Sequence, residues 1–433
     1  MDPLLSRFAS GFARRADAVI IGGGVVGLTT ALELAEQGMS VCLLDRSEVG
    51  SAQSGRNWGF VRQQGRAVEE LPLMIEANRM WPLLKEHLKA DIEWVQGGNL
   101  RLTDNPDRAE EYHRWIEAAR SFGLDSRVAS GDEVSAMLPG FTGRYLTAIV
   151  TPSDGQANPV KVVAAYAAAL RSLRVEVCEN LAVRQVVTAG GRVEGVETDA
   201  GFIAAPIVVV AAGTGSAELL ERVGIRVPVH FVTQTVTLTD TVPKFTTSCV
   251  WTGDVGFRQT SSGGVVLSSG GRGDMRLDAG AIKSLMSPRM LRQGIPMYWK
   301  NREYLRVRPW ELIRNAGKSA EDHHSNGTVR HSDVANSLAT MGRYFPKTRW
   351  AASIAWAGTI DGTPDALPVI DAVDRPSGLA IATGMSGHGF GIAPAVGRAV
   401  ASLVTHGDNV RELAPFRAGR FADGTLSAPR HLL

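Results

Sequence analysis

The chain has 433 residues, which is long for a single hydrophobic core, so we expect two closely joined domains. Its 46 basic and 44 acidic residues nearly cancel, and this balance gives no global field that would favour binding to nucleic acid. The three cysteines, Cys42, Cys178 and Cys249, are far apart and odd in number, which predicts neither a metal site nor a disulfide framework.

Residues 1–16 form an N-terminal extension with large apolar residues and arginines, but without the continuous apolar core of a secretory signal. We expect a frayed terminus or a helix packed on the body, and a weak interfacial anchor is the alternative. No run of about eighteen apolar residues is present, so no segment is expected to span a membrane. These features predict a cytoplasmic protein, with peripheral association with the inner face of a membrane as the alternative.

Residues 18–45 combine a strand, a glycine turn, a helix and a second strand. The strands are expected over 19–21 and 41–44, and the helix over 28–37, with G-x-G-x-x-G between the first strand and the helix. This order is typical of a Rossmann βαβ unit that binds a dinucleotide, and a coincidental glycine turn is the alternative. The candidates for cofactor contacts in this unit are Gly22, Gly24, Val25, Val26, Gly27 and Asp45.

Each glycine of the motif has a physical task. Gly22 allows the tight turn, Gly24 lets the backbone approach a pyrophosphate, and Gly27 brings the helix close to the strand. Asp45 follows about twenty residues later, where a carboxylate can accept hydrogen bonds from ribose hydroxyls and disfavours a 2′-phosphate. The unit therefore predicts FAD or NAD(H) rather than NADP.

The segment 46–66 follows the second strand and is rich in small residues and arginines. Cofactor and substrate meet at this place in a Rossmann fold, so we expect a cofactor-facing loop with one helical turn. A solvated basic loop is the alternative. The candidates for cofactor contacts here are Arg46, Ser54, Gly55, Arg56 and Asn57.

The middle of the chain predicts alternating helices and strands. Helices are expected over 69–88, 107–122, 130–138 and 160–173, and a strand pair over 92–102 that turns at Gly97 and Gly98. Strands over 174–177, 181–187, 192–198 and 202–204 predict a small antiparallel meander.

Residues 207–210 predict a buried strand that ends in Ala211, Ala212 and Gly213, which permit close backbone approach to a ligand. We expect this strand to return to the central sheet beneath the cofactor, and a tight turn into a helix at 217–223 is the alternative. Alternating strands over 226–267 indicate a sheet with one solvated or ligand-facing side. Two helices are expected within 270–330 and one over 334–344.

The last third of the chain repeats the pattern of the opening unit. Strands are expected over 349–359 and 379–383, followed by a glycine turn and a helix over 393–404. The N-terminus of such a helix can stabilise the negative charge that a reduced flavin carries at its N1–C2=O edge.

On these residues the chain resembles the D-amino-acid oxidase superfamily of FAD enzymes, in the branch of glycine oxidase, sarcosine oxidase and D-amino-acid dehydrogenases. The resemblance covers nearly the whole chain and rests on four stretches in order, 18–38, 183–216, 356–371 and 384–397. It implies an α/β fold with a Rossmann-type FAD-binding domain, discontinuous in sequence, and an α+β second domain with a mixed sheet. The FAD-binding domain would comprise 17–88, 145–228 and 349–433, and the substrate-binding or cap domain 89–144 and 229–348.

The resemblance also implies roles for single residues. Gly22, Gly24, Gly27, Asp45 and Arg46 would hold the ADP half of FAD, and Ser54, Gly55 and Asn57 would lie near the pyrophosphate and flavin. The backbone of Val183 would meet adenine. The remaining cofactor candidates are Ala212, Gly213, Gly358, Gly387, His388, Gly389 and Phe390.

The candidates for substrate and catalysis are fewer. Arg62 matches an arginine that helps to hold the substrate carboxylate in the sarcosine oxidase branch, and Arg258 and Arg276 are further candidates for that contact. His388 would stabilise the anionic reduced ring, so that His388 and Arg62 are the catalytic candidates. A structural histidine bonded to backbone is the alternative for His388.

Departures from the family pattern leave the substrate and the electron acceptor open. Ile360 stands where glycine oxidases have an arginine, and Gly391 replaces a lysine of some sarcosine oxidases. No cysteine lies near the T-P-D motif at residues 363–365, so FAD is expected to be bound noncovalently. An oxygen-activating lysine has no counterpart near 270–276, which favours a dehydrogenase over an oxidase.

The resemblance implies FAD-dependent oxidation of the C–N bond of an amino acid, or of a secondary or N-methylated amine that carries a carboxylate. Hydride transfer to flavin N5 would give an imine that hydrolyses. The electron acceptor would be O2, a quinone or a partner protein. One alternative is a flavin-bearing subunit of a multi-subunit amine dehydrogenase. Another is an NAD(P)H-dependent flavin monooxygenase, which the motifs within 356–371 and 384–397 disfavour.

Overall fold

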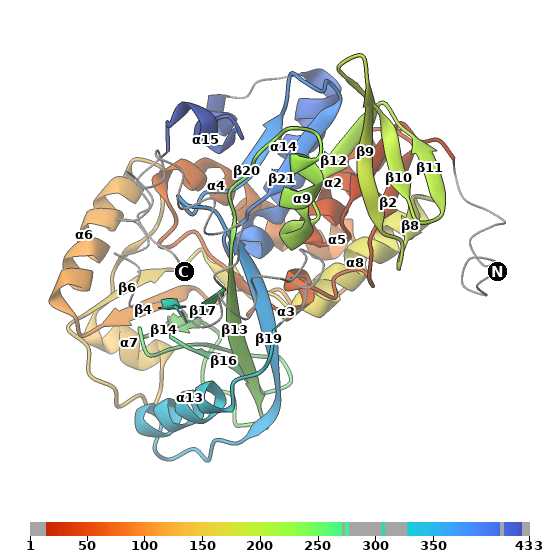
Figure 1. The fold of residues 1–433 in the computed structure, drawn as a ribbon. Coiled ribbons are helices and arrows are strands. Elements are labelled where there is room, and N and C mark those ends of the chain that lie inside the picture. The colour runs from red at the N-terminus through yellow and green to blue at the C-terminus, as the bar shows by residue number, and fades with distance from the viewer. Residues whose placement is uncertain (1–13, 271–272, 277–304, 308–326, 408–410, 427–433) are drawn as a thin grey trace.

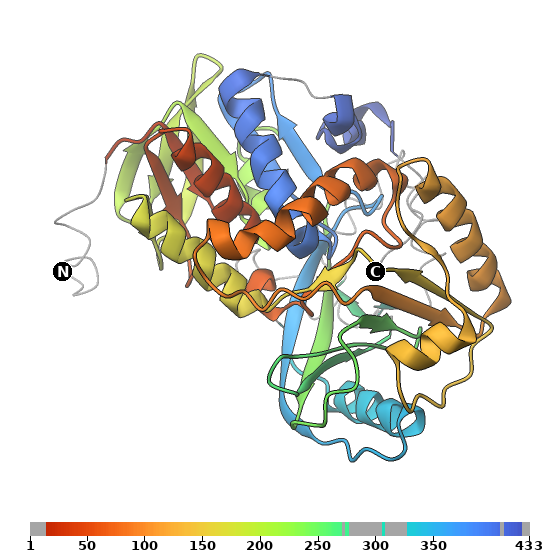
Figure 2. The ribbon, with the colours of Figure 1, turned by 180° about the vertical axis from the view of Figure 1, so that it is seen from behind.

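A computed structural model of the chain describes residues 14–270, 273–276, 305–307, 327–407 and 411–426. Two large sheets occupy different halves of the molecule, and helices cover each of them (Figure 1 and, from behind, Figure 2). One sheet has six strands in the order β20-β21-β12-β1-β2-β8, and the other has ten. The predicted α/β class with a second, mixed sheet is confirmed.

The six-stranded sheet has the Rossmann pattern that the sequence predicts. Five of its strands run parallel and the edge strand β20 is antiparallel. The strands are β1 (Ala18–Ile21), β2 (Val41–Leu44), β8 (Glu176–Cys178), β12 (Ile207–Val210), β20 (Val369–Ala372) and β21 (Leu379–Thr383). β12 pairs with β1 in the register Ala18↔Ile207, which confirms that this strand returns to the centre of the sheet.

The prediction that residues 174–177 belong to the meander is wrong. Their strand, β8, pairs in parallel with β2, because the fully buried β2 would otherwise be an unpaired edge. The meander itself consists of β9 (Val183–Ala189), β10 (Arg192–Thr198) and β11 (Gly201–Ala204). Its inward residues Val186, Val193 and Ile203 belong to the apolar core on one face of the sheet.

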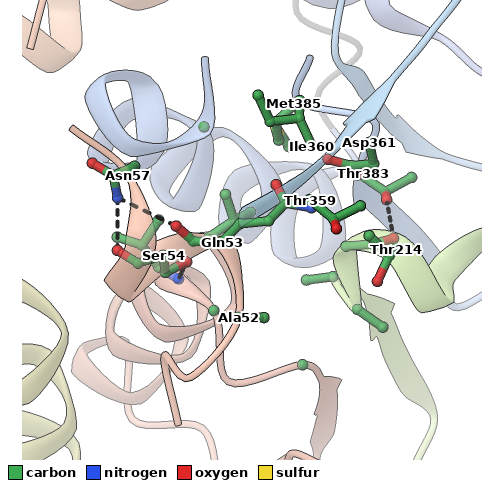
Figure 3. Close-up of a pocket in the computed structure, with 18 of the residues that line it drawn as sticks. Ala52, Gln53, Ser54, Asn57, Thr214, Thr359, Ile360, Asp361, Thr383 and Met385 are labelled. Atoms are coloured by element: carbon green, nitrogen blue, oxygen red, sulfur yellow. Dashed lines mark hydrogen bonds between the residues drawn. The ribbon is translucent and has the colours of Figure 1, made fainter. Parts of the chain in front are cut away.

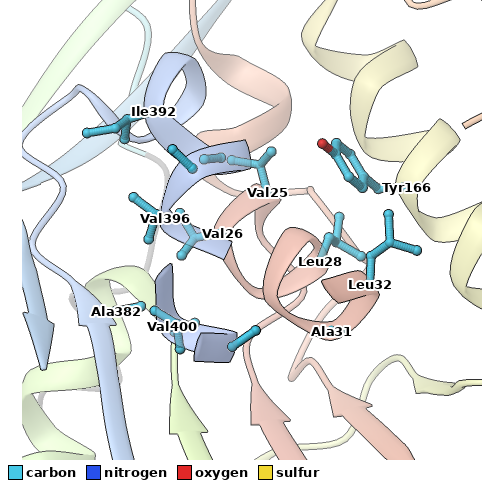
Figure 4. Close-up of a cluster of buried hydrophobic side chains, with 14 of the residues drawn as sticks. Val25, Val26, Leu28, Ala31, Leu32, Tyr166, Ala382, Ile392, Val396 and Val400 are labelled. Atoms are coloured by element: carbon cyan, nitrogen blue, oxygen red, sulfur yellow. The ribbon is translucent and has the colours of Figure 1, made fainter. Parts of the chain in front are cut away.

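Helices cover the other face of the six-stranded sheet. They are α2 (Val25–Glu36), α4 (Leu71–Met80), α8 (Pro159–Ser172) and α14 (Gly389–His406). Figure 4 shows apolar side chains of α2, α14 and α8, among them Leu28, Val396 and Tyr166, in one cluster. Gly397 lets α14 approach α2 closely, since a Cβ at this position would lie 2.6 Å from Thr29 Oγ1. The core therefore fixes the first turns of α2 and α14 relative to each other.

Two predicted helices differ from the structure more than the others do. The segment expected as one helix over 69–88 consists of η1 (Val68–Glu70), α4, η2 (Trp81–Leu83) and α5 (Leu84–His87). Pro82 explains the break after α4, since proline lacks the N–H that a continuous helix needs. α14 begins at Gly389, earlier than the predicted start at residue 393. The prediction starts too late because Gly389 and Gly391 interrupt the apolar period in the first turn.

The ten-stranded sheet draws its strands from distant parts of the chain. Among the described residues, the helices on this sheet are α6 (Pro106–Arg120), α7 (Gly131–Met137) and α13 (His331–Tyr344). Its first strands are β4 (Asn99–Thr103), β5 (Arg127–Val128), β6 (Thr147–Thr151), β13 (His230–Thr239) and β14 (Cys249–Trp251). The others are β15 (Val255–Gln259), β16 (Val265–Ser269), β17 (Gly273–Arg276), β18 (Leu305–Val307) and β19 (Ala352–Gly362). β6 and β19 thus belong to this sheet, although the predicted domain boundaries assign both to the FAD-binding domain; those boundaries stay a prediction.

The strand pair predicted over 92–102 is wrong in its first half. β4 forms there, and Val95 makes an isolated bridge to Gln156 in place of a strand. Between them, a Cβ at Gly97 would lie 2.0 Å from Thr247 O, so the backbone passes close to another segment at this point. Small elements complete the described chain: β3 (Phe60–Val61), which pairs with β7 (Gly155–Gln156), α3 (Gln53–Arg56), η3 (Gly213–Gly215), α9 (Ser216–Glu221), η5 (Arg411–Phe416) and α15 (Arg420–Asp423).

Two predictions fall largely on residues outside the described ranges. These are the helices within 270–330 and the conformation of residues 1–13. The last residues of the extension are paired with β11, because Ala204 N donates to Arg14 O and Ala16 N donates to Ala204 O. Among the described helices, none has the length and apolar character needed to cross a membrane.

Candidate functional site

A cavity of about 580 Å³ lies between the two sheets. It is lined by the residues that end β1, β2, β12 and β21 and by residues of β13 and β19. In Figure 3, Ser54 and Asn57 of the loop after β2 lie on one side, and Thr214 and Thr383 lie on the other. This is the crevice at the carboxyl ends of parallel strands where open α/β sheets bind ligands.

The glycine turn after β1 closes one end of the cavity by backbone contact. Gly22 has φ +114°, and a Cβ there would lie 2.3 Å from Ala211 O. A Cβ at Gly27 would lie 2.0 Å from Gly22 O, so Gly27 serves helix packing and does not line the cavity. At Gly24, which does line it, the nearest atom to a Cβ is Ser54 Oγ at 3.2 Å. The turn therefore brings bare backbone to the edge of the cavity.

Two helix N-termini open onto the same cavity. α2 contributes Val25 and Val26, and α14 contributes Gly389 and Phe390. Neither helix has an acidic residue in its first turn, so both positive ends are available to a negatively charged ligand. Val25 N donates to Ser54 Oγ at 2.8 Å. This arrangement fits a pyrophosphate at α2 and a second site of negative charge at α14.

Asp45 holds the glycine turn and the following loop together. Its Oδ2 accepts from Gly23 N at 2.7 Å, and its Oδ1 accepts from Ser47 N at 2.8 Å. Burial raises the pKa of Asp45. The predicted residues Asp45 and Arg46 line the cavity, and so do Val183, Ala212 and Gly213.

The loop after β2 has the single helical turn that the sequence predicts, α3. Arg56 Nε donates to Ser51 O at 2.8 Å and its Nη1 to Ala357 O at 3.4 Å, which ties the loop to β19. Ser54, Arg56 and Asn57 line the cavity together with Gly358 of β19. Gly55 does not line the cavity, and a Cβ at this position would lie 2.6 Å from Gly50 O.

A cluster of three arginines lies at another part of the cavity wall. Arg62 and Arg66 come from the turn after β3, and Arg101 comes from β4. A Cβ at Gly65 would lie 2.3 Å from Arg101 Nη1 and 3.4 Å from Arg62 Nη1, so the two guanidinium groups approach the same point. We call these three residues the arginine cluster. Sequence reasoning identified Arg62 and missed the other two.

The electrostatics of the arginine cluster favour an anionic ligand. Burial, together with the neighbouring Arg66 and Arg101, holds the pKa of Arg62 well below its usual range. Burial lowers the pKa of Arg66 to about 10, and Arg66 Nη1 is buried without a hydrogen-bond partner in the described structure. Buried guanidinium groups this close repel each other. The carboxylates of Glu70 and Asp154 offset part of this repulsion, and an anion bound between the guanidinium groups would lower it further.

His388 is the residue before α14, but its side chain turns away from the cavity. The ring is buried, and Nδ1 lies 2.8 Å from Glu70 Oε1. Burial lowers the pKa of His388 to about 4, so the imidazole is neutral at pH 7 and donates to the Glu70 carboxylate. Gly387 and Gly389 line the cavity and His388 does not. A catalytic role for His388 stays a prediction, and its contact in the structure is a carboxylate rather than backbone.

The other two predicted substrate arginines differ from Arg62. Arg258 is buried in the wall, where its Nε donates to Trp58 O and its Nη1 to Gln156 Oε1 at 3.0 Å. It does not line the cavity. The side chain of Arg276 lies outside the part of the chain that the structure describes.

Several lining residues carried no signal in the sequence. Asn99 and Gln234 are buried polar side chains of β4 and β13, and Asn99 Oδ1 and Gln234 Nε2 have no partner among the described residues. Trp58 and Trp251 stack with ring centroids 5.2 Å apart and form an apolar wall. Unpartnered buried polar atoms next to an apolar wall are typical of a ligand-binding site.

The described residues include no group of three or more His, Cys, Asp or Glu that could hold a metal ion. Cys42, Cys178 and Cys249 are buried, unpaired and absent from the cavity wall.

Comparisons with known proteins show what the whole chain is similar to. A family model described as FAD dependent oxidoreductase matches residues 17–403. The chain is 26% identical to glycine oxidase of Geobacillus kaustophilus over 420 residues, which cover 94% of this chain and 97% of the relative. It is 26% identical to sarcosine oxidase subunit beta of Rhizobium meliloti over 419 residues, which cover 95% of this chain and 89% of the relative. The solved structure of L-amino acid deaminase from Proteus vulgaris has a TM-score of 0.86 at 21% identity, over 95% of this chain and 98% of that one.

Proposed function

The chain belongs to the family of FAD-dependent oxidoreductases that oxidise amino acids or amines, and we propose that its own substrate carries a carboxylate. The substrate would be an amino acid, or a secondary or N-methylated amine, oxidised at its C–N bond. The imine that results would hydrolyse in water.

The glycine turn, α2 and α14 are the elements that would hold FAD. Gly22 and Gly24 would let the pyrophosphate approach the N-terminus of α2, and Asp45 and Val183 would lie at the ADP end. Gly387 to Phe390 would lie at the flavin end. When bound, the flavin supplies a hydride acceptor at N5. Noncovalent binding is supported by the cavity wall, whose described lining residues include no cysteine.

The arginine cluster is the single observation that carries the substrate proposal. A carboxylate can accept two parallel hydrogen bonds from a guanidinium group. The guanidinium groups of Arg62 and Arg101 approach the same point, and Arg66 lines the same cavity. Anchoring the carboxylate there would fix the orientation of the amine-bearing carbon within the cavity. Orientation of this kind supplies much of the rate when a cofactor carries the chemistry.

An anaerobic screen for flavin reduction tests the proposal. The FAD-loaded enzyme is mixed with D- and L-amino acids, N-methyl amino acids and secondary amines, and loss of flavin absorbance is followed. Each carboxylate substrate is paired with its amide, which has nearly the same shape and no charge. We expect the amide to react at least about ten-fold less efficiently, as loss of a charge-assisted hydrogen bond predicts. Equal efficiency of acid and amide would contradict the proposal.

A second candidate is a flavin-bearing subunit of a larger amine dehydrogenase. It is favoured by the similarity to a relative whose name marks it as a subunit. Turnover of the isolated chain in air with release of peroxide supports an oxidase that uses O2. Reduction without peroxide, and activity only with a quinone or a partner protein, supports the second candidate. The cytoplasmic location stays a prediction.

A further inference from the structure

The turn of residues 62–66 carries two arginines of the cluster, and a single buried carboxylate holds its backbone. This carboxylate is Asp154, in the connection between β6 and β7, and its exposed fraction is 0%. Asp154 Oδ1 accepts from Gln63 N at 2.8 Å and from Gln63 Nε2 at 3.1 Å. Its Oδ2 accepts from Gln64 N at 3.2 Å. Both oxygens are therefore engaged by the turn.

The guanidinium groups of Arg62 and Arg66 donate hydrogen bonds to backbone carbonyl oxygens of the turn itself. Arg62 Nη1 donates to Gln64 O at 2.6 Å, and Arg66 Nε donates to Arg62 O at 3.3 Å. Because each guanidinium group is bonded to a carbonyl of the turn, a shift of the turn backbone moves both groups. Asp154 thus orients the guanidinium groups of Arg62 and Arg66 through the turn backbone, without a direct hydrogen bond to either group.

Glu70 also acts on Arg62 and Arg66 through its charge, but the hydrogen bonds on the other side of the turn involve neutral groups. The buried Gln64 side chain donates to Thr151 Oγ1 at 3.1 Å and to Asn99 O at 3.2 Å, and Trp115 Nε1 donates to Arg66 O at 2.8 Å. These partners are neutral, whereas hydrogen bonds to a carboxylate are stronger. The negative charge of Asp154 also favours the charged form of the Arg62 guanidinium.

We propose that Asp154 is a positioning residue for the anionic group of the substrate: it fixes the turn 62–66 so that Arg62 and Arg66 stay aimed into the cavity. This inference rests on the proposed function, in which the arginine cluster binds a carboxylate. Asp154 itself does not line the cavity and does not touch the reacting atoms.

The test compares the full-length, FAD-loaded wild type with Asp154→Asn. Benzoate and benzamide serve as a matched pair of probes that differ in charge, and their dissociation constants are read from the perturbation of flavin absorbance. We expect the wild type to prefer benzoate, and Asp154→Asn to lose about ten-fold or more in benzoate affinity with benzamide affinity unchanged. With a turnover substrate that bears a carboxylate, KM should rise by a similar factor and kcat should stay within about three-fold.

Asp17→Asn is the matched control. Asp17 Oδ2 also clamps a loop, accepting from Ser40 N at 2.8 Å and from Ser40 Oγ at 2.6 Å, but it is exposed and absent from the cavity wall. Asp17→Asn should leave the dissociation constants of benzoate and benzamide unchanged. A fall in benzoate affinity in Asp17→Asn equal to that in Asp154→Asn would overturn the inference, since a general loss of stability would then explain both.

Gln63→Met keeps the test decisive if Asp154→Asn does not fold with FAD. This variant retains the carboxylate and removes one of its three hydrogen bonds, so an intermediate loss of benzoate affinity, about two- to five-fold, is expected. Unchanged charge preference in either folded variant overturns the role of Asp154 and leaves the proposed function in place. A wild type that binds benzoate no better than benzamide overturns both.

Discussion

The two parts of the cavity wall are built by different means. The glycine turn is a backbone structure within one continuous stretch, and its form follows from the absence of side chains at Gly22, Gly24 and Gly27. The arginine cluster consists of side chains from a turn and from β4, which meet only because the fold brings them together. A backbone site can therefore be predicted from local residue spacing, whereas a side-chain cluster depends on tertiary structure.

The largest effect is expected from Gly22→Ala, which breaks the backbone part of the site. The new Cβ would lie 2.3 Å from Ala211 O at a residue with φ +114°, so β1 and β12 would have to separate. We expect the purified variant to retain less than about one tenth of its FAD, measured by flavin absorbance per protein.

Gly38→Ala is the matched control for this variant. Gly38 also has a positive φ, +87°, but no atom lies within 4 Å of a Cβ there. Only conformational strain of about 1 kcal/mol is expected, with normal FAD content and a modest fall in Tm. Full FAD content in Gly22→Ala would refute the close contact with β12.

Arg62→Ala and Arg66→Ala test the side-chain part of the cavity wall. Loss of one guanidinium group removes charge-assisted hydrogen bonds, so KM for a carboxylate substrate should rise about ten- to hundred-fold while FAD content stays normal. Steady-state kinetics of the reactive substrate from the anaerobic screen measure this.

Arg398→Ala is the control for the arginine variants, because Arg398 is exposed and pairs with Glu33 and Glu76 at the surface. Its KM should equal that of the wild type. An unchanged KM in Arg62→Ala would remove this residue from the substrate site.

A smaller, pH-dependent effect is expected at Asp154. Burial raises the pKa of Asp154 from 3.8 to about 6, so the carboxylate is charged at pH 7.5 and loses its charge as the pH falls below 6. Protonation of Asp154 weakens its hydrogen bonds to the turn and its attraction for the nearby Arg62 and Arg66. Cys249 also lies near Asp154, and its thiol stays neutral because burial raises its pKa. We expect the dissociation constant of benzoate to increase several-fold between pH 7.5 and pH 5.5.

Asp154→Asn provides the reference for this pH profile, since it lacks the titrating group and has the same FAD and probe. Its benzoate affinity should change less over the same range than that of the wild type. Parallel profiles in the two proteins would assign the pH dependence to another group.

The smallest effect is expected from His388→Asn. The Asn amide can donate to Glu70 as the neutral imidazole does, and a histidine with a pKa of about 4 does not titrate between pH 5 and pH 9. The value of kcat should fall by less than about five-fold, with an unchanged pH profile. A hundred-fold loss of kcat would instead establish His388 as a catalytic residue.

The fold was predictable where local pattern and tertiary structure agree. β1, α2 and β2 follow from apolar period and glycine spacing, and β21 has the predicted bounds. β8 was misassigned because a short apolar strand carries no information about which sheet it joins. The start of α14 was missed because Gly389 and Gly391 offer neither helix propensity nor an apolar period.

The site was predictable only in part, and the reasons differ between residues. Arg66 is one of several arginines in a polar loop, and only its burial, at 3% exposed, distinguishes it. Arg101 lies in a strand whose partners are set by the whole sheet, so no spacing could relate it to Arg62. His388 was singled out by its motif, but its ring turns to Glu70, which from sequence alone is an ordinary acid at the start of a helix.

The place of Arg101 on β4 bears on how enzymes of this architecture diverge in evolution. β4 pairs with β6 and β14, and the glycine turn lies in the other sheet. In the proposed function, a substitution at position 101 would change the charge beside the substrate and leave the glycine turn after β1 intact. The charge at the substrate end and the backbone at the cofactor end could therefore change independently in evolution.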